Sequence, residues 1–172
     1  EAFQDFLALK YFSHSSKKIY SEEGWYLTGD AGLFLDPLYS PGSDFIGMSN
    51  TCITDLITRS CSGEKLVTRV QEYERIIRTI FAGFLLIYEN QYPVMGSAKA
   101  MSLKIVWDFV MYWGGIALIY FGGKLCDPEF MNAARTHLNK FFVLNVKIQK
   151  LLLKWSSQER ENYENSGVFL DY

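Results

Sequence analysis

Apolar residues recur every three or four positions from about residue 45 to residue 160, and this period is the strongest constraint on the fold of the chain. The run from Glu64 to Gln91 shows it best, with apolar residues at Leu66, Val70, Tyr73, Ile77, Ile80, Phe84 and Tyr88. Side chains with this spacing fall on one face of a helix. The pattern predicts a mainly α chain, with a small β portion confined to the first 44 residues.

A helix is also expected before this one. It begins near Phe45, with Ser43 or Asp44 as the residue whose side chain caps its free N–H groups. It continues to about Cys61, where the pair Ser62-Gly63 breaks it.

Two further helices are expected after Gln91. The segment Ala98–Phe121 is apolar almost all round, which indicates a helix buried on several sides. Its uncharged run, residues 109–123, is shorter than the roughly 20 residues that cross a bilayer, so we do not expect a membrane partner. Asp127-Pro128-Glu129 combines a capping carboxylate, an N-terminal proline and an acid in the first turn. A helix is therefore predicted from Asp127 to about residue 157, followed by a polar tail.

The first 44 residues have a different pattern. Phe6–Phe12 is rich in aromatic and apolar residues and ends in a polar turn, and Gly24–Thr28 is a short apolar run that stops at Gly29-Asp30. Both are predicted to be strands, and a loop is expected at 31–43. The chain is thus expected to divide into residues 1–44, residues 45–62 and a helical domain at residues 63–172.

Composition excludes several classes of protein. The net charge of −2 and the pI of about 5.7 argue against a nucleic-acid partner. Cys52, Cys61 and Cys126 are odd in number and lack metal-ligand spacing, so we expect free thiols in a reducing, cytoplasmic compartment and no metal site. The N-terminus lacks an initiator methionine and the features of a signal peptide. We therefore expect the chain to be part of a longer protein.

Most single polar and aromatic side chains have structural interpretations. His14 and His137 stand alone, and Glu72 and Glu74 lie among arginines, which favours a helix surface with ion pairs over acid–base chemistry. A group of aromatic residues at helical spacing is expected in the core. The alternative is that these residues form an aromatic wall over a substrate pocket. This group consists of Tyr73, Tyr88, Trp107, Tyr112 and Trp113.

The residues that indicate chemistry lie between Gly29 and Gly42. Glycines let the backbone approach a ligand closely, and a carboxylate such as that of Asp30 accepts hydrogen bonds from sugar-like hydroxyl groups. N–H groups at the start of the next helix can face a negatively polarised group. This combination suits a ligand that carries a polyol and an electron-rich ring, although an ordinary turn is the alternative.

This stretch resembles the second flavin-binding motif of the flavin-dependent halogenases and related aromatic hydroxylases. The motif reads Gly-Asp-Ala-Ala-x-Phe-x-Asp-Pro-x-x-Ser-Ser/Thr-Gly and is followed by a helix. The agreeing positions are Gly29, Asp30, Ala31, Phe34, Asp36, Pro37, Ser40 and Gly42. The close resemblance covers about residues 8–57. It implies the C-terminal part of a two-domain, hydroxylase-like α/β flavoprotein that binds FAD and is followed by a helical domain.

The resemblance also implies roles for individual residues. Asp30, between Gly29 and Ala31, would bind the ribitol chain of FAD, and Pro37 would lie against the isoalloxazine ring. The backbone N–H groups at Gly42 and Ser43 would approach the N1/C2 edge of the ring. A halide would sit at Ser40 and Gly42, but Pro41 between them lacks an N–H group, so one expected donor is gone.

The implied activity is that of an FAD-dependent monooxygenase or halogenase. Such an enzyme activates O2 at reduced FAD and hydroxylates or halogenates an aromatic or carrier-bound small molecule, and a flavin reductase supplies the reduced cofactor. The chain has no Gly-x-Gly-x-x-Gly, so the ADP-binding unit and the catalytic residues are expected outside it, and the chain alone is expected to be inactive. The alternative is a helical module that docks on a protein or membrane surface without catalytic activity.

Overall fold

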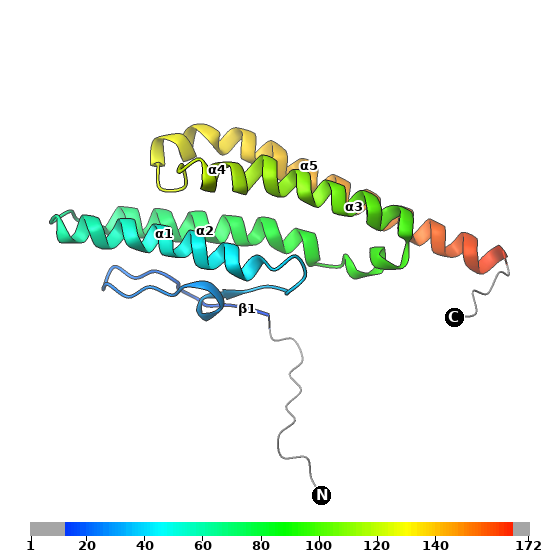
Figure 1. Ribbon diagram of the computed structural model, residues 1–172, viewed down its shortest axis with the longest axis horizontal. Coiled ribbons are helices and arrows are strands. Elements are labelled where there is room, and N and C mark those ends of the chain that lie inside the picture. Colours follow the sequence, from blue (N-terminus) through cyan, green and yellow to red (C-terminus); the bar gives the residue numbers. More distant parts are fainter. Residues whose placement is uncertain (1–12, 167–172) are drawn as a thin grey trace, which may run out of the picture. The chain divides into compact units, whose positions relative to one another are not determined.

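A computed structural model describes residues 13–166, with side chains up to residue 162. These residues form a mainly helical chain with one small sheet (Figure 1), which confirms the predicted fold class at this level. The predicted strand Phe6–Phe12 lies outside the described residues. The chain divides into two compact units between Ile77 and Arg78, a point that falls within helix α2 (Val67–Tyr88).

The sheet of the first unit consists of two short antiparallel strands. Strand β1 (His14–Ser15) pairs with β2 (Leu33–Phe34), with His14 opposite Phe34. The predicted strand Gly24–Thr28 is wrong, because this segment makes only an isolated bridge between Tyr20 and Tyr26. The reason is local: the turn at Gly24, with φ of 87°, folds the segment straight back, so only a few backbone groups can pair.

Helix α1 (Pro41–Cys61) begins four residues before the predicted start at Phe45 and ends where predicted. Pro41 occupies its first turn, where a missing N–H removes no helix hydrogen bond. Ser40 therefore precedes the helix, and the expected caps Ser43 and Asp44 lie inside it. The buried residues recur with helical spacing and are Pro41, Phe45, Met48, Ser49, Cys52 and Leu56.

Polar contacts join α1 to the first half of α2. The Tyr73 hydroxyl donates a hydrogen bond of 2.6 Å to Asp55 Oδ2, which also pairs with Arg59 at 2.8 Å. Arg59 and Arg69 both pair with Glu64 in the connection. Burial alone would raise the pKa of Asp55, but hydrogen bonds from Arg59 and Tyr73 outweigh it and lower that pKa. The predicted ion pairing of Glu72 is confirmed by its contact with Arg75.

The second unit contains the end of α2, the 3₁₀ turn η2 (Tyr92–Gly96) and two long helical segments. The first segment runs through α3 (Ala98–Met111), the π-helical η3 (Tyr112–Ala117) and α4 (Leu118–Phe121). The second is α5 (Pro128–Ser166), which packs along α3.

The start of α5 agrees with the sequence, but its end does not. Asp127 Oδ1 accepts a hydrogen bond of 3.0 Å from the Phe130 N–H, which confirms the predicted cap. The helix continues to Ser166 rather than to about residue 157, so most of the predicted polar tail is helical. Residues 167–172 lie outside the described residues.

A buried polar network lies between α3 and α5. Lys104 is fully buried and pairs with Asp108 at 2.9 Å, while its Nζ also donates to Gln149 and to the Ile87 carbonyl. Gln149 Nε2 in turn donates to Asp108 at 2.7 Å. Burial lowers the pKa of Lys104, and the hydrogen bond and charge of Asp108 oppose that shift.

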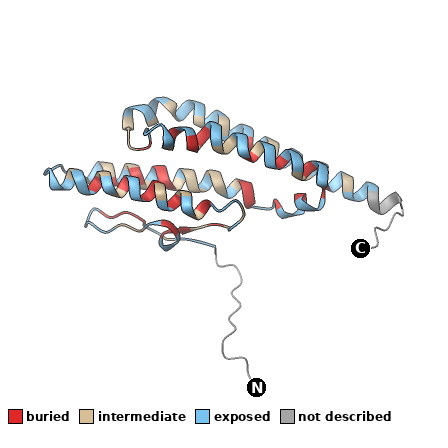
Figure 2. Cartoon of the chain, viewed as in Figure 1, coloured by how far each residue is buried: buried red, intermediate tan, exposed pale blue. Residues whose placement is uncertain are grey.

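The outer side of the helix Ala98–Phe121 is exposed, so its predicted burial on several sides is wrong (Figure 2). Trp113 is 55% exposed and is not a core residue, whereas Tyr73 and Tyr88 are buried as expected. By length and composition this helix is able to cross a membrane. An 18-residue stretch of it has a mean hydropathy of 1.3, and 28% of that stretch is buried. The prediction was wrong because apolar residues on all sides of a helix show that the helix is hydrophobic, but they do not show whether other parts of the protein cover it.

Candidate functional site

The Gly29–Ala31 segment forms the single 3₁₀ turn η1, which packs against the beginning of α1. Gly29 makes this contact possible in two ways. Its φ of 52° is strained for residues with a side chain, and a Cβ atom at this position would collide with the side chain of Ile46. The glycine therefore fixes how closely the turn approaches α1.

This packing brings Asp30 beside the N-terminus of α1. Asp30 Oδ1 lies 3.4 Å from the position that a Cβ atom on Gly42 would occupy, so a side chain at Gly42 would be in contact with the carboxylate. Asp30 is exposed, and within residues 13–166 its carboxylate has no hydrogen bond or ion pair. The predicted site residues at 29–31 and at 42–43 are therefore neighbours in space.

The first N–H groups of α1 are also available. Helices leave their first N–H groups without internal acceptors, and the Ser40 side chain does not cap α1. The Gly42 and Ser43 N–H groups have no acceptor in the part of the chain that the structure describes. An exposed carboxylate and unsatisfied N–H groups thus lie at one end of the same helix.

Strand β1 and the residue after it, Ser16, hold the backbone of the Asp30 turn, a role that sequence reasoning missed. His14 Nε2 lies 2.9 Å from the Asp30 carbonyl oxygen, and because a carbonyl only accepts, this nitrogen donates. Ser16 donates from its hydroxyl to the Ala31 carbonyl at 3.4 Å and from its N–H to Gly32 at 2.8 Å. The polar run Ser13–Ser16 was the available signal, but nothing in the sequence identifies its partners.

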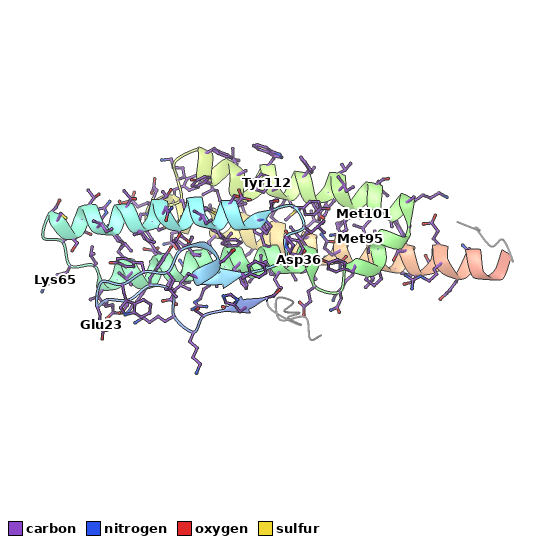
Figure 3. All side chains as sticks on the ribbon, turned by 60° about the horizontal axis from the view of Figure 1, so that its bottom comes forward. Glu23, Asp36, Lys65, Met95, Met101 and Tyr112 are labelled. Atoms are coloured by element: carbon purple, nitrogen blue, oxygen red, sulfur yellow. The ribbon has the colours of Figure 1, made fainter. Side chains whose placement is uncertain are left out.

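The turn between β2 and α1 uses Asp36 and Pro37. Asp36 Oδ1 accepts a hydrogen bond of 2.9 Å from the Leu38 N–H, so this carboxylate shapes the turn; Asp36 is labelled in Figure 3. The Ser40 N–H donates to the Pro37 carbonyl at 2.9 Å. Pro37 is exposed in this turn. At the expected halide position, the Ser40 amide is therefore occupied and Pro41 has none.

These groups define what the site can bind. The Asp30 carboxylate can accept hydrogen bonds from hydroxyl groups, and the helix N–H groups can donate to an electron-rich atom. Among the described residues, no group of three His, Cys, Asp or Glu side chains could hold a metal ion. The arrangement suits an organic ligand with hydroxyls at one end and a hydrogen-bond acceptor at the other.

Comparison with known proteins supports a distant relationship to flavin-dependent halogenases. The chain is 26% identical over 170 residues to the flavin-dependent halogenase chlA of Dictyostelium discoideum, a match that covers 97% of the chain. The chain spans only 27% of the length of that protein. No family model and no solved structure matches the chain. The similarity nevertheless extends beyond the motif-bearing residues 8–57 into the helical region.

Proposed function

We propose that this chain belongs to an FAD-dependent oxidoreductase, a halogenase-like monooxygenase that acts on an aromatic or carrier-bound substrate. The observation that carries this proposal is the unpaired carboxylate of Asp30 beside Gly42 at the N-terminus of α1. The similarity to a flavin-dependent halogenase along nearly the whole chain supports it. Catalytic residues and the ADP-binding unit would be supplied by other parts of the intact protein.

In this proposal the chain binds and orients the flavin half of FAD. Asp30 would accept hydrogen bonds from the ribitol hydroxyls, and the N–H groups of Gly42 and Ser43 would donate to the N1/C2 edge of the ring. Gly29 and Ala31 set the position of Asp30, and the exposed Pro37 would lie against the ring. When bound, reduced FAD supplies the activation of O2.

Halogenation and hydroxylation remain competing forms of the proposed reaction. The halide position at Ser40 and Gly42 retains the Ser40 hydroxyl and the Gly42 amide, but it lacks the amides of Ser40 and Pro41. The two reactions are distinguished with the intact protein, a flavin reductase and bromide. A product whose mass contains bromine shows halogenation, and a product that gains only oxygen shows hydroxylation.

The first prediction tests the flavin site itself. Replacing Asp30 with Asn in the intact protein removes the charge that holds the ribitol, and we expect FAD to bind about tenfold to a hundredfold more weakly. The dissociation constant is measured by flavin fluorescence. Thermal unfolding of the apoprotein should be unchanged, because the Asp30 side chain has no partner among the described residues and the backbone bond to His14 is kept.

Glu23→Gln provides the matched control. Glu23 is another exposed acidic residue of the first unit whose side chain has no described interaction, so its variant should bind FAD like the unaltered protein. Equal FAD affinity of the Asp30 and Glu23 variants would refute the proposed role of Asp30.

The second candidate function, a helical interaction module, rests on the exposed apolar residues of Ala98–Phe121. It requires no flavin, so an intact protein that binds no FAD would favour it.

A further inference from the structure

The outer surface of the helix Ala98–Phe121 carries almost no charge. Its charged residues are Lys99, Lys104 and Asp108, and the last two are buried and paired with each other. Beyond Lys99, no charged side chain of this described helix is exposed. The large apolar residues that are more than half exposed are Leu103, Val106, Phe109, Trp113, Leu118 and Phe121. A continuous helix thus presents an apolar surface bounded by Lys99 and by Lys124.

Helix α5, which packs along α3, carries exposed basic side chains among exposed apolar ones such as Val143 and Leu144. Between Phe130 and Gln158 the sequence contains no Asp or Glu, although the whole chain has a net charge of −2. The basic residues in this stretch, all of them exposed, are Arg135, Lys140, Lys147, Lys150 and Lys154. Two of the lysines, Lys140 and Lys147, line a hollow of about 410 Å³ together with Val143 and Leu144. Positive charge and apolar surface are therefore combined within one unit.

We propose that α3, η3, α4 and α5 together form a docking surface for an anionic lipid bilayer, with the apolar side chains among the lipids and the basic ones at the headgroups. Helices with an apolar side and a face rich in lysine and arginine are typical of proteins that lie in the membrane interface. Each basic residue near an anionic leaflet strengthens binding severalfold. Exposed aromatic residues such as Trp113 suit the interfacial depth.

A spanning orientation and a second copy of the chain fit these observations less well. If Ala98–Phe121 crossed the bilayer, α5 would be drawn in with its basic side chains, each of which is strongly unfavourable in hydrocarbon. Lysines are also depleted at the centres of protein interfaces, and two copies of α5 would repel each other. Lipid headgroups with negative charge satisfy both the apolar and the basic parts of the surface.

The test is binding of the full chain to vesicles, measured by co-sedimentation. We expect binding to vesicles of phosphatidylcholine with about a quarter phosphatidylserine and much weaker binding to phosphatidylcholine alone. The Phe109→Gln/Phe121→Gln variant should reduce the partition coefficient at least about tenfold. The Lys147→Gln/Lys150→Gln/Lys154→Gln variant should reduce it about fivefold per lysine, and only on the anionic vesicles.

Matched controls come from the first unit. Ile57 and Val67 are 51% and 50% exposed, so Ile57→Gln/Val67→Gln repeats the apolar change elsewhere, and Lys17→Gln/Lys18→Gln/Lys65→Gln repeats the change in charge. Both control variants should bind like the unaltered chain. Absence of binding to anionic vesicles, or equal losses in the control variants, would overturn the proposal. A dimer in solution that Phe109→Gln/Phe121→Gln dissociates, without vesicle binding, would instead assign this surface to a second copy.

Discussion

Gly29 is the residue on which the geometry of the candidate site most depends. Replacing it with alanine forces a side chain into a backbone with φ of 52° and against Ile46. The backbone strain contributes about 1–2 kcal/mol, and the crowding adds about 1 kcal/mol or more. We predict that Gly29→Ala lowers the free energy of unfolding by the sum of both effects, measured by urea denaturation.

Gly24 separates the two contributions to this prediction. It also has a positive φ, 87°, but an added Cβ would meet no atom within 4 Å. Gly24→Ala should therefore show the backbone strain alone and be the less destabilising substitution. Equal losses in the two variants would mean that the close approach of η1 to α1 contributes nothing.

Single residues also show how far the sequence determines the site. Gly29, Asp30 and Gly42 were chosen from the resemblance of one short segment to a flavin-binding motif, and the structure places Asp30 beside Gly42. His14 could not be chosen in this way, because its hydrogen bond to the Asp30 carbonyl depends on the pairing of β1 with β2. Because each of these strands has only two residues, their pairing produces no alternating pattern that could be recognised in the sequence.

At the scale of elements, helices with a clear stripe or cap were predicted and short extended segments were not. The apolar face of α2 and the Asp127 cap of α5 were predicted from local sequence patterns, and both occur in the structure. Gly24–Thr28 has strand-forming residues but only one bridge partner, Tyr20. Strand formation requires a neighbouring strand, which a local pattern cannot supply.

The buried Lys104–Asp108 pair lies within α3, and Gln149 of α5 forms hydrogen bonds with both of its members. Removing one partner leaves a buried charge, so Lys104→Met should lower the free energy of unfolding by about 3–5 kcal/mol. Replacing Asp108 with Leu as well removes the unpaired buried carboxylate. The effects of the two substitutions on the free energy of unfolding should therefore be non-additive by about 2 kcal/mol. Chemical denaturation of the single and double variants measures this coupling.

A surface ion pair provides the comparison for this double-mutant cycle. Arg75 and Glu72 are 3.8 Å apart, with 56% and 26% of their side chains exposed. The same cycle, with Arg75→Met and Glu72→Leu, should give a coupling below about 0.5 kcal/mol. A coupling for Lys104 and Asp108 no larger than this would show that burial does not strengthen their interaction.

For the molecule as a whole, what the sequence predicts poorly is the surface that a helix presents. The helix Ala98–Phe121 was expected to be buried because its apolar residues point in all directions, yet large apolar residues such as Val106, Leu118 and Phe121 are more than half exposed. The sequence pattern of a helix covered by protein is the same as that of one that faces lipid. Only the placement of α5 on one side distinguishes them.

Acid sensitivity is also a property of the whole molecule, because each unit carries at least one carboxylate with a lowered pKa. In the first unit, burial opposes the shift, but hydrogen bonds from Arg59 and Tyr73 lower the pKa of Asp55. In the second, the Phe130 N–H and then Lys124 lower the pKa of Asp127. Because the unfolded chain takes up these protons first, folding stability is lost as the pH falls below about 4.

Tyr73→Phe tests this linkage in the first unit. The variant loses the 2.6 Å hydrogen bond to Asp55, and near neutral pH we expect its free energy of unfolding to fall by about 1.5–3 kcal/mol. Below about pH 4 the difference from the unaltered chain should narrow, since protonated Asp55 no longer offers a charged acceptor. Tyr26→Phe, which removes a hydroxyl without a described hydrogen bond, should change stability little at any pH. A Tyr73→Phe loss of constant size from neutral to acid pH would show that the charge of Asp55 does not strengthen this contact between α1 and α2.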